Sequence, residues 1–395
     1  MFTILPLSNG LDNVCGFYTQ GIHAGFKPNN KEDVAFIRTD TPCDVSAVFT
    51  SNVFQAAPIK HFLRYPKGFQ TNFILMNAKN ANAMTGQKGI EDIDVLFEKL
   101  KHTFPSLHNP IMSSTGVIGY RLNVEKLSTA FSKFDFSAKH SHSTASAIMT
   151  TDSFKKELCF KIILENGSFF HIAAICKGAG MINPAMATML CFILTDANIP
   201  KADMDELLLP AIEHSFNAVS VDGDTSTNDT VLLLSSKQNT YHKEAFNEAL
   251  KRLTKELSLM LVRDGEGATK VVAFEVSGAK SLEEASKAAK ALSNSLLVKT
   301  ALFGEDPNWG RIASTIGASG ITCSEESLVI HYDDVLIYSD TQRSLTPEAE
   351  KLAAAVMKKE SFRIHCEIGV GNYAFTAYGC DLGHEYVKIN ADYRT

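Results

Sequence analysis

A threonine behind a glycine-rich loop is the residue of this sequence with the clearest chemical potential. Lys177-Gly178-Ala179-Gly180 opens a loop that runs through Pro184 to Ala187-Thr188, and its glycines give the backbone unusual freedom. A threonine hydroxyl is a weak nucleophile until a base takes its proton, and a free α-amino group on the same residue can be that base. Cutting the Ala187–Thr188 bond would create this amino group. The residue types are equally compatible with Thr188 as a plain helix cap after a glycine turn.

The residues after Thr188 determine how that amino group would behave. Met189 to Leu194 are all apolar, and the pattern predicts a helix from about Thr188 to Asp196. Thr188 would then sit at a helix N-terminus, where the positive end of the helix dipole favours the neutral form of the amine. The unperturbed pKa of an α-amino group, roughly 7.7–8.0, suits a base that works near neutral pH.

The rest of the chain predicts an α/β protein with mixed sheets layered with helices. Asn166-Gly167 is a hairpin signal between two β-rich runs, 161–165 and 168–176. Apolar residues on one helical face from Phe246 to Leu261 predict a long helix. Further along we expect strands at 271–276 and 296–302, helices at 282–292, 306–316 and 347–358, and two hairpin-like stretches at 328–338 and 362–378.

Composition narrows the class of protein. With 395 residues the chain is long enough for two domains, or for one large domain and a smaller one. The net charge of −6 and the absence of any Lys/Arg run of five or more residues argue against nucleic acid as a partner. The longest apolar run is far shorter than the roughly 20 residues of a membrane helix, and the N-terminus does not resemble a secretory signal. Eight scattered cysteines suggest free thiols in the cytoplasm. We predict no metal site, because the acidic stretch Asp222–Asp229 is equally typical of a capped turn.

Seven motifs together resemble one family, the ornithine acetyltransferases (glutamate N-acetyltransferases). In that family the threonine of an Ala-Thr-Met-Leu step becomes an N-terminal nucleophile. The resemblance implies an ornithine acetyltransferase-like fold and a chain cut into an α chain, residues 1–187, and a β chain, residues 188–395. The matching segments are 114–119, 149–152, 177–190, 220–230, 264–270, 303–311 and 389–395.

The same resemblance implies roles for single residues. Thr115 and Gly116 would form the oxyanion hole, for which a hydroxyl and a backbone N–H are suitable donors. The residues expected to contact substrate are Thr150, Lys177, Thr188, Glu266, Asn390 and Thr395. A cation at Lys177 suits a substrate carboxylate, and a carboxylate at Glu266 suits an amino group on ornithine. Taken without the family, Thr115-Gly116 and Glu266 would be ordinary turns and Lys177 a solvated loop lysine.

The reaction implied is acetyl transfer from N2-acetylornithine to glutamate through an acetyl-Thr188 intermediate, in arginine synthesis. It needs no cofactor, although some family members also accept acetyl-CoA as donor. The family further implies a heterotetramer of two α and two β chains. Two alternatives stay open: an N-terminal-threonine aminopeptidase or amidohydrolase, which lets water take the acyl group, and an uncleaved α/β binding protein whose glycine loops hold an anion.

One segment departs from the family pattern. Ala78-Lys79 stands where Ser-Gly is common, and Met84 stands where Cys is usual. A bulky lysine therefore replaces a glycine, and we expect any effect to be on substrate preference and not on the class of reaction.

Overall fold

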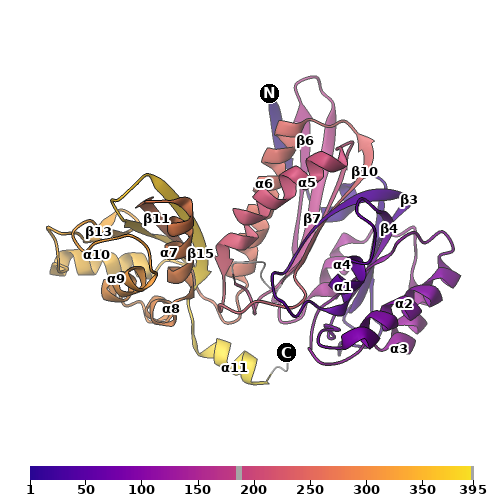
Figure 1. Ribbon diagram of the computed structural model, residues 1–395, viewed down its shortest axis with the longest axis horizontal. Helices are drawn as coiled ribbons and strands as arrows, with labels where there is room; N and C mark the ends of the chain where they lie inside the picture. Colours follow the sequence, from indigo (N-terminus) through magenta and orange to yellow (C-terminus); the bar gives the residue numbers. More distant parts are fainter. Residues whose placement is uncertain (184–188, 393–395) are drawn as a thin grey trace.

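The computed structural model describes residues 1–183 and 189–392, and their strands form two sheets (Figure 1). Ala187, Thr188 and Thr395 lie outside the described residues. The predicted α/β class with mixed sheets is confirmed, since both sheets contain parallel and antiparallel pairs.

The larger sheet combines strands from both ends of the sequence in the order β1-β6-β7-β8-β10-β3-β4-β5, with β2 paired to β3. The predicted hairpin at Asn166-Gly167 is confirmed by the antiparallel pair β6 and β7. Bounds are β1 (Phe2–Pro6), β2 (Phe17–Ile22), β3 (Val34–Phe49), β4 (Gln70–Asn77), β5 (Ile111–Ser114), β6 (Lys156–Leu164), β7 (Phe169–Lys177), β8 (Leu190–Ala197) and β10 (Thr230–Asn239).

Helices cover both faces of this sheet. Helices α5 (Lys201–Glu213) and α6 (Lys243–Arg263) pack on one face, and α4 (Ser141–Ile148) packs on the other. Side chains of a strand alternate between faces. In β7, Ile172, Ala174 and Cys176 share the core with α6, whereas Ala173 and Ile175 share the core with α4. The alternation therefore directs Lys177, the last residue of β7, to the α4 side. Near β4 and β5 lie α1 (Ala57–Phe62), α2 (Gly86–Thr103) and α3 (Val124–Ala130).

The smaller sheet has the order β13-β12-β14-β11-β15-β9 and shares one apolar core with four helices. The C-terminal helix α11 (His384–Asp392) follows β15 and lies apart from both sheets in Figure 1. Bounds are β9 (Val219–Ser220), β11 (Val271–Ala279), β12 (Val329–Tyr332), β13 (Val335–Tyr338), β14 (Ser361–Glu367), β15 (Tyr373–Cys380), α7 (Leu282–Asn294), α8 (Leu296–Phe303), α9 (Trp309–Ala318) and α10 (Pro347–Met357).

The predicted helix over 188–196 is wrong. Leu190–Ala197 form strand β8, which lies between β7 and β10 and is buried on both faces. A strand buried on both faces is apolar throughout, so its sequence lacks the alternation that distinguishes it from a short buried helix. The residues after Thr188 therefore provide no helix dipole that could lower the pKa of a Thr188 amine.

Three smaller predictions also need correction. Residues 296–303 form helix α8 and not a strand, because the Ser295 hydroxyl accepts the Val298 N–H and caps it. Helix α9 begins at Trp309 with Asn308 as its N-cap, and not at Pro307 with Asp306 as its N-cap. The stretch 362–378 is no hairpin, since β11 lies between β14 and β15.

The predicted division into residues 1–187 and 188–395 stays a prediction, and strands from both ranges share the larger sheet. Within residues 1–183 and 189–392, none of the helices combines the length and the apolar character needed to cross a membrane.

The packing of α4 on β2 gives a first prediction. A Cβ at Gly21 of β2 would lie 2.0 Å from the Ser143 carbonyl oxygen of α4. Gly21→Ala must therefore push α4 away and should lower the free energy of unfolding by about 1–3 kcal/mol, measured by urea denaturation. In the control Gly317→Ala, within α9, the new methyl meets no atom within 4 Å and should raise stability by about 0.5–1 kcal/mol. Equal stability of Gly21→Ala and wild type would contradict this packing.

Candidate active site

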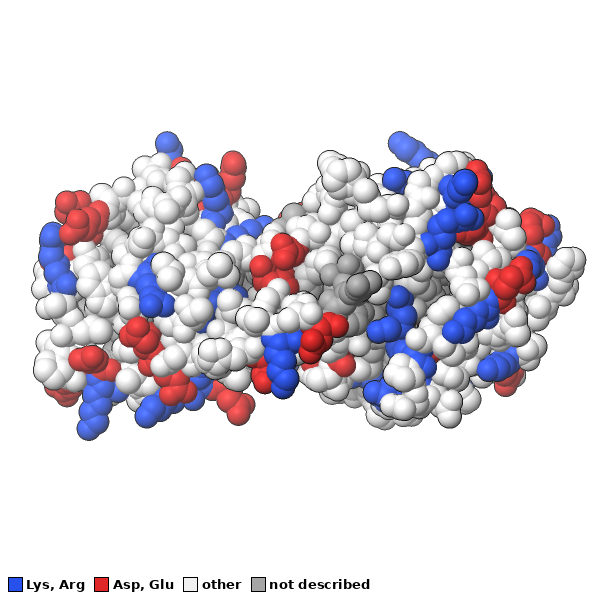
Figure 2. Space-filling model, turned by 90° about the horizontal axis from the view of Figure 1, so that it is seen from below, with Lys and Arg blue, Asp and Glu red and all other residues white. Residues whose placement is uncertain are grey.

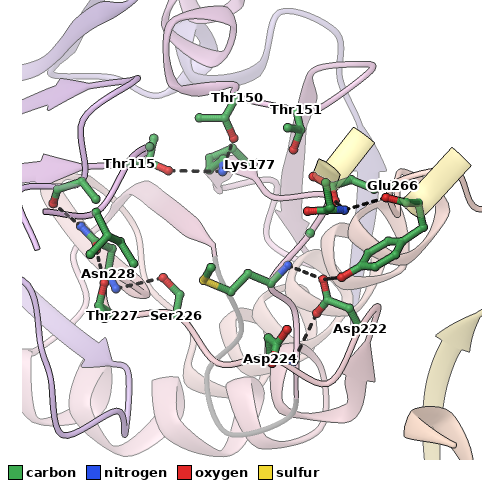
Figure 3. Close-up of a pocket in the computed structure, with 17 residues that line it drawn as sticks. Thr115, Thr150, Thr151, Lys177, Asp222, Asp224, Ser226, Thr227, Asn228 and Glu266 are labelled. Atoms are coloured by element: carbon green, nitrogen blue, oxygen red, sulfur yellow. Dashed lines mark hydrogen bonds between the residues drawn. The ribbon is translucent and has the colours of Figure 1, made fainter. Parts of the chain in front are cut away.

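Six of the predicted site residues line one cavity of about 130 Å³ (Figure 3). Five separate parts of the chain supply them: the loops after β5, α4 and α6, the end of β7, and helix α11. They are Thr115, Gly116, Thr150, Lys177, Glu266 and Asn390. Residues from position 115 to position 390 thus meet at one place.

Lys177 is the cationic side of the cavity. Its ammonium donates to Thr150 Oγ1 at 2.8 Å and to Thr115 Oγ1 at 3.3 Å. The side chain is buried, so it is not the solvated loop lysine of the simplest interpretation. Burial lowers the pKa of Lys177, and the nearby carboxylate of Asp152 acts in the opposite direction.

The loop with Thr115 and Gly116 is held by a second loop. Thr115 N–H donates to Asn77 O at 3.0 Å, and Val117 N–H donates to Lys79 O at 3.3 Å. Gly116 has φ +131°, and a Cβ there would lie 2.3 Å from the carbonyl carbon of Lys79, so this position requires glycine. The Gly116 N–H has no acceptor among the described residues. It is therefore available to a ligand in the cavity.

The loop that departs from the family pattern is this supporting loop. Lys79 has φ +72°, a left-handed conformation that glycine adopts at little cost, which explains why a glycine is common at this position. Lys79 and Met84 do not line the cavity, whereas Ala81 does. The expected effect of the departure on substrate preference stays a prediction.

The opposite side of the cavity is acidic, with Glu266, Asp222 and Asp224 facing Lys177 across it (Figure 3). Asn390 donates to Glu266 Oε2 at 2.6 Å, which places the C-terminal helix on the cavity. Asp222 accepts the N–H groups of Met181 and Ile182 at 2.6 and 2.9 Å, and burial raises the pKa of its carboxyl. Asp222 thus anchors the loop that leads toward Thr188.

On the outer face that Figure 2 shows, positive and negative side chains are not separated as they are in the cavity. Lysine, arginine, aspartate and glutamate are interspersed over the face that Figure 2 shows. Within the part of the chain that the structure describes, no group of three or more His, Cys, Asp or Glu side chains could hold a metal ion.

Comparison with known proteins identifies the family. A family model described as "ArgJ family" matches residues 18–395. The arginine biosynthesis bifunctional protein ArgJ of Wolinella succinogenes is 58% identical over 396 residues, covering 100% of both chains. Its counterpart from Caldanaerobacter subterraneus subsp. tengcongensis is 38% identical over 393 residues, covering 96% of this chain and 97% of the relative. The chain belongs to the ArgJ family.

A crystal structure of ArgJ from Bacillus halodurans is also similar, with 37% sequence identity and a TM-score of 0.48, covering 51% of this chain and 98% of that chain. Membership of the ArgJ family confirms the predicted resemblance and, with it, the class of acyltransferase in arginine biosynthesis. The roles of the individual site residues stay predictions, and two of these residues, Thr188 and Thr395, lie outside the described residues.

Sequence reasoning missed several polar residues at this ArgJ family site. Asn228 and Asp229 belong to a segment that was interpreted as a turn. Asp229 is fully buried, and its Oδ1 accepts the N–H of Met189, the residue after Thr188, at 3.0 Å. Burial raises the pKa of this carboxyl, and the nearby Lys177 ammonium acts in the opposite direction. Its place in a segment similar to the family was a signal, but only the fold shows what it contacts.

Asn228 connects the two loops behind the oxyanion position and gives a second prediction. Its buried amide donates to Ala81 O at 2.7 Å and to Ser114 O at 2.8 Å. Asn228→Ala leaves both carbonyl groups unpaired, so we expect a loss of about 1–3 kcal/mol in unfolding free energy together with a lower kcat. The control Asn72→Ala removes a buried amide that bonds Ser106 O at 2.9 Å, away from the cavity, and should lower stability alone. Similar losses of kcat in both variants would contradict a specific role for Asn228.

Proposed function

We propose that this protein transfers the acetyl group of N2-acetylornithine to glutamate through an acetyl-Thr188 intermediate, in arginine biosynthesis. The observation that carries the proposal is the convergence of six predicted residues on one cavity with a cationic and an acidic side. An N-acetylated amino acid carries an anionic carboxylate, and ornithine adds a cationic amine. The distribution of charge in the cavity matches a substrate with both.

Thr188 is the proposed nucleophile, freed by self-cleavage of the Ala187–Thr188 bond. In the transfer reaction its α-amino group takes the hydroxyl proton as the oxygen attacks the acetyl carbonyl. Collapse of the tetrahedral centre returns that proton to the nitrogen of ornithine as the C–N bond breaks. Glutamate then attacks the acetyl ester through its neutral amine, and the proton that this amine loses passes by way of the α-amino group to the Thr188 oxygen as the ester C–O bond breaks. Thr115 and Gly116 stabilise the oxyanion in both half-reactions, the acetylation of Thr188 and the transfer of acetyl to glutamate.

The hydrogen bonds around Thr115 support its role as an oxyanion donor. A threonine hydroxyl has one hydrogen and accepts through its lone pairs. Because Lys177 donates to Thr115 Oγ1, the hydroxyl hydrogen is free to point elsewhere. Together with the N–H of Gly116 it forms the pair of donors that a tetrahedral oxyanion requires.

The remaining features of the proposal concern substrates and assembly. Lys177 and Thr150 would bind a substrate carboxylate, and Glu266 with Asn390 would bind the amino group of ornithine, with Thr395 completing the tail. The cycle uses no cofactor, and acetyl-CoA is a second donor to be tested. We further propose that two α and two β chains assemble in the cytoplasm, where the eight cysteines remain free thiols.

Acetyl transfer separates the proposed enzyme from a hydrolase with the same nucleophile. With N2-acetylornithine labelled in the acetyl group, the protein should form labelled N-acetylglutamate only when glutamate is present, and it should release little acetate without it. Thr188→Ala should form neither product. Release of acetate at the same rate with and without glutamate would favour the aminopeptidase or amidohydrolase alternative.

The role of Thr115 predicts a defect in the chemical step. Removal of one oxyanion donor typically lowers kcat by about 10²–10³, or roughly 2.7–4 kcal/mol, so Thr115→Ala should show this loss with little change in KM. Thr115→Ser, which keeps the hydroxyl, is the matched control and should retain most of the activity. Rates are measured on variants shown by mass to match wild type in cleavage. Near-normal kcat in Thr115→Ala would remove Thr115 from the reaction.

A further inference from the structure

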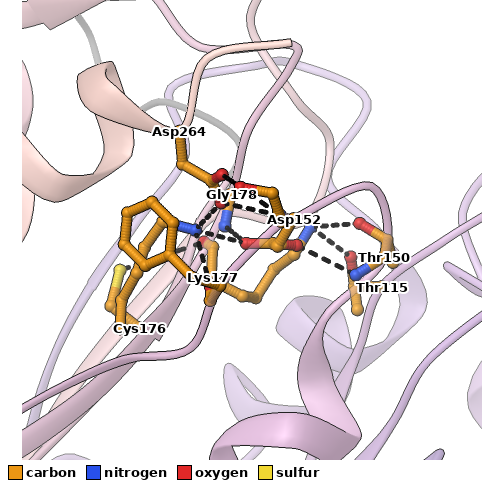
Figure 4. A network of polar contacts seen from close by, with 10 residues as sticks. Thr115, Thr150, Asp152, Cys176, Lys177, Gly178 and Asp264 are labelled. Carbon is orange, nitrogen blue, oxygen red and sulfur yellow. Dashed lines mark hydrogen bonds and ion pairs between the residues drawn. The ribbon is translucent and has the colours of Figure 1, made fainter. Parts of the chain in front are cut away.

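Behind Lys177 lies a chain of buried charges that neither motifs nor family roles explained. The side chains of Asp152 and Lys156 are both fully buried, and Lys156 donates to Asp152 Oδ1 at 2.8 Å. Lys156 also pairs with Asp264, which directly follows α6. Figure 4 shows Asp152 between Lys177 and Asp264. Burying four charges costs a large desolvation energy, so their arrangement calls for an explanation.

Asp152 contacts the backbone at both partners of the Lys177–Thr150 hydrogen bond. Its Oδ2 accepts the Thr150 N–H at 2.9 Å, and its Oδ1 accepts the N–H of Gly178, next to Lys177, at 2.7 Å. Both hydrogen bonds have an ionised acceptor and are therefore strong. One carboxylate thus fixes the spacing between the loop after α4 and the end of β7.

The charge of Asp152 also affects the protonation of Lys177. Burial lowers the pKa of Lys177, and Asp152 is the group that most strongly opposes this effect. Burial raises the pKa of Asp152, but Lys177 and Lys156 outweigh it and hold that pKa below its usual range. The other titratable groups that face Lys177 are Lys156, Cys176, Glu266, Lys27 and Asp229.

A protonated Lys177 has a donor left for a ligand. An ammonium group has three N–H donors. Among the described residues, two of them are used, by Thr115 and Thr150. The third can reach a carboxylate in the cavity, and its partner Thr115 keeps a free hydroxyl hydrogen. A neutral Lys177 would keep only two N–H donors, so loss of the proton would leave none for a carboxylate while Thr115 and Thr150 are bound.

We propose that Asp152 is a positioning residue, which holds Lys177 against Thr150 and Thr115 and keeps the ammonium protonated for substrate. Lys156, which also pairs with Asp264, donates to the Oδ1 of this carboxylate and balances part of its negative charge. Asp152 itself does not line the cavity, so it acts through Lys177. The inference rests on the proposed function in one respect only, that the ligand of Lys177 is a substrate carboxylate.

The pH dependence of kcat/KM for acetyl transfer tests this proposal with two variants of opposite effect. Asp152→Asn removes the carboxylate, so the basic limb should move to lower pH by about one unit or more. Lys156→Met removes a neighbouring cation, and the same limb should stay in place or move to higher pH. Asp264→Asn, which alters the pair one step further from Lys177, is the matched control and should leave the limb unchanged. The folding of each variant is checked by its unfolding transition.

A readout independent of activity separates this inference from the proposed function. Trace carbamylation of Lys177 by cyanate, followed against pH by mass spectrometry of its peptide, reports the pKa of the amine. Its midpoint should fall in Asp152→Asn and not in Lys156→Met. An unmoved midpoint and limb in folded Asp152→Asn, or equal downward shifts in both variants, would overturn the positioning role. If the wild-type protein transfers no acetyl group but the variants show the predicted midpoints, the proposed function is wrong and the positioning role of Asp152 stands.

Discussion

The burial of the Lys177 ammonium is the constraint on which the rest of the site depends. A cation in the protein interior must be balanced and hydrogen-bonded, or it gives up its proton. The necessary groups come from the loop after α4, from the start of β6 and from the end of α6, through Thr150, Asp152, Lys156 and Asp264. The position of Lys177 at the end of β7 therefore requires all of these elements to converge.

This requirement also explains the arrangement of the larger sheet. Alternation along β7 directs Lys177 to the face that carries α4, and the loop with Thr115 follows β5 at the far end of the strand order. Strand β8, which begins two residues after Thr188, lies directly beside β7 and pairs Leu190 with Lys177. The residue proposed as nucleophile thus precedes a strand fixed on both sides. Positions 115, 150 and 177 are brought together by sheet order and not by nearness in the sequence.

The sequence predicted the α/β class and six residues that line the cavity. It did not predict strand β8, which begins close to Thr188. Thr115, Lys177 and Glu266 were found only through the resemblance to a family, because taken alone they are typical of turns and of a solvated loop lysine. Strand β8 was predicted as a helix because a strand covered on both faces has no alternation. The contacts of Asp152 and Asp229 were out of reach, since Asp152 accepts the N–H of Gly178, 26 residues away, and Asp229 accepts the N–H of Met189, 40 residues away.

The central claim is that Thr188 carries the acetyl group after the chain is cut before it. The most direct measurement is the intact mass of the purified polypeptides, taken before and shortly after mixing with N2-acetylornithine in the absence of glutamate. The account predicts two polypeptides, residues 1–187 and 188–395, and a gain of one acetyl group on the second alone, at Thr188. Addition of glutamate should then remove that acetyl group. An active protein that consists of one intact chain, or that transfers acetyl without any adduct on the second polypeptide, would contradict the account.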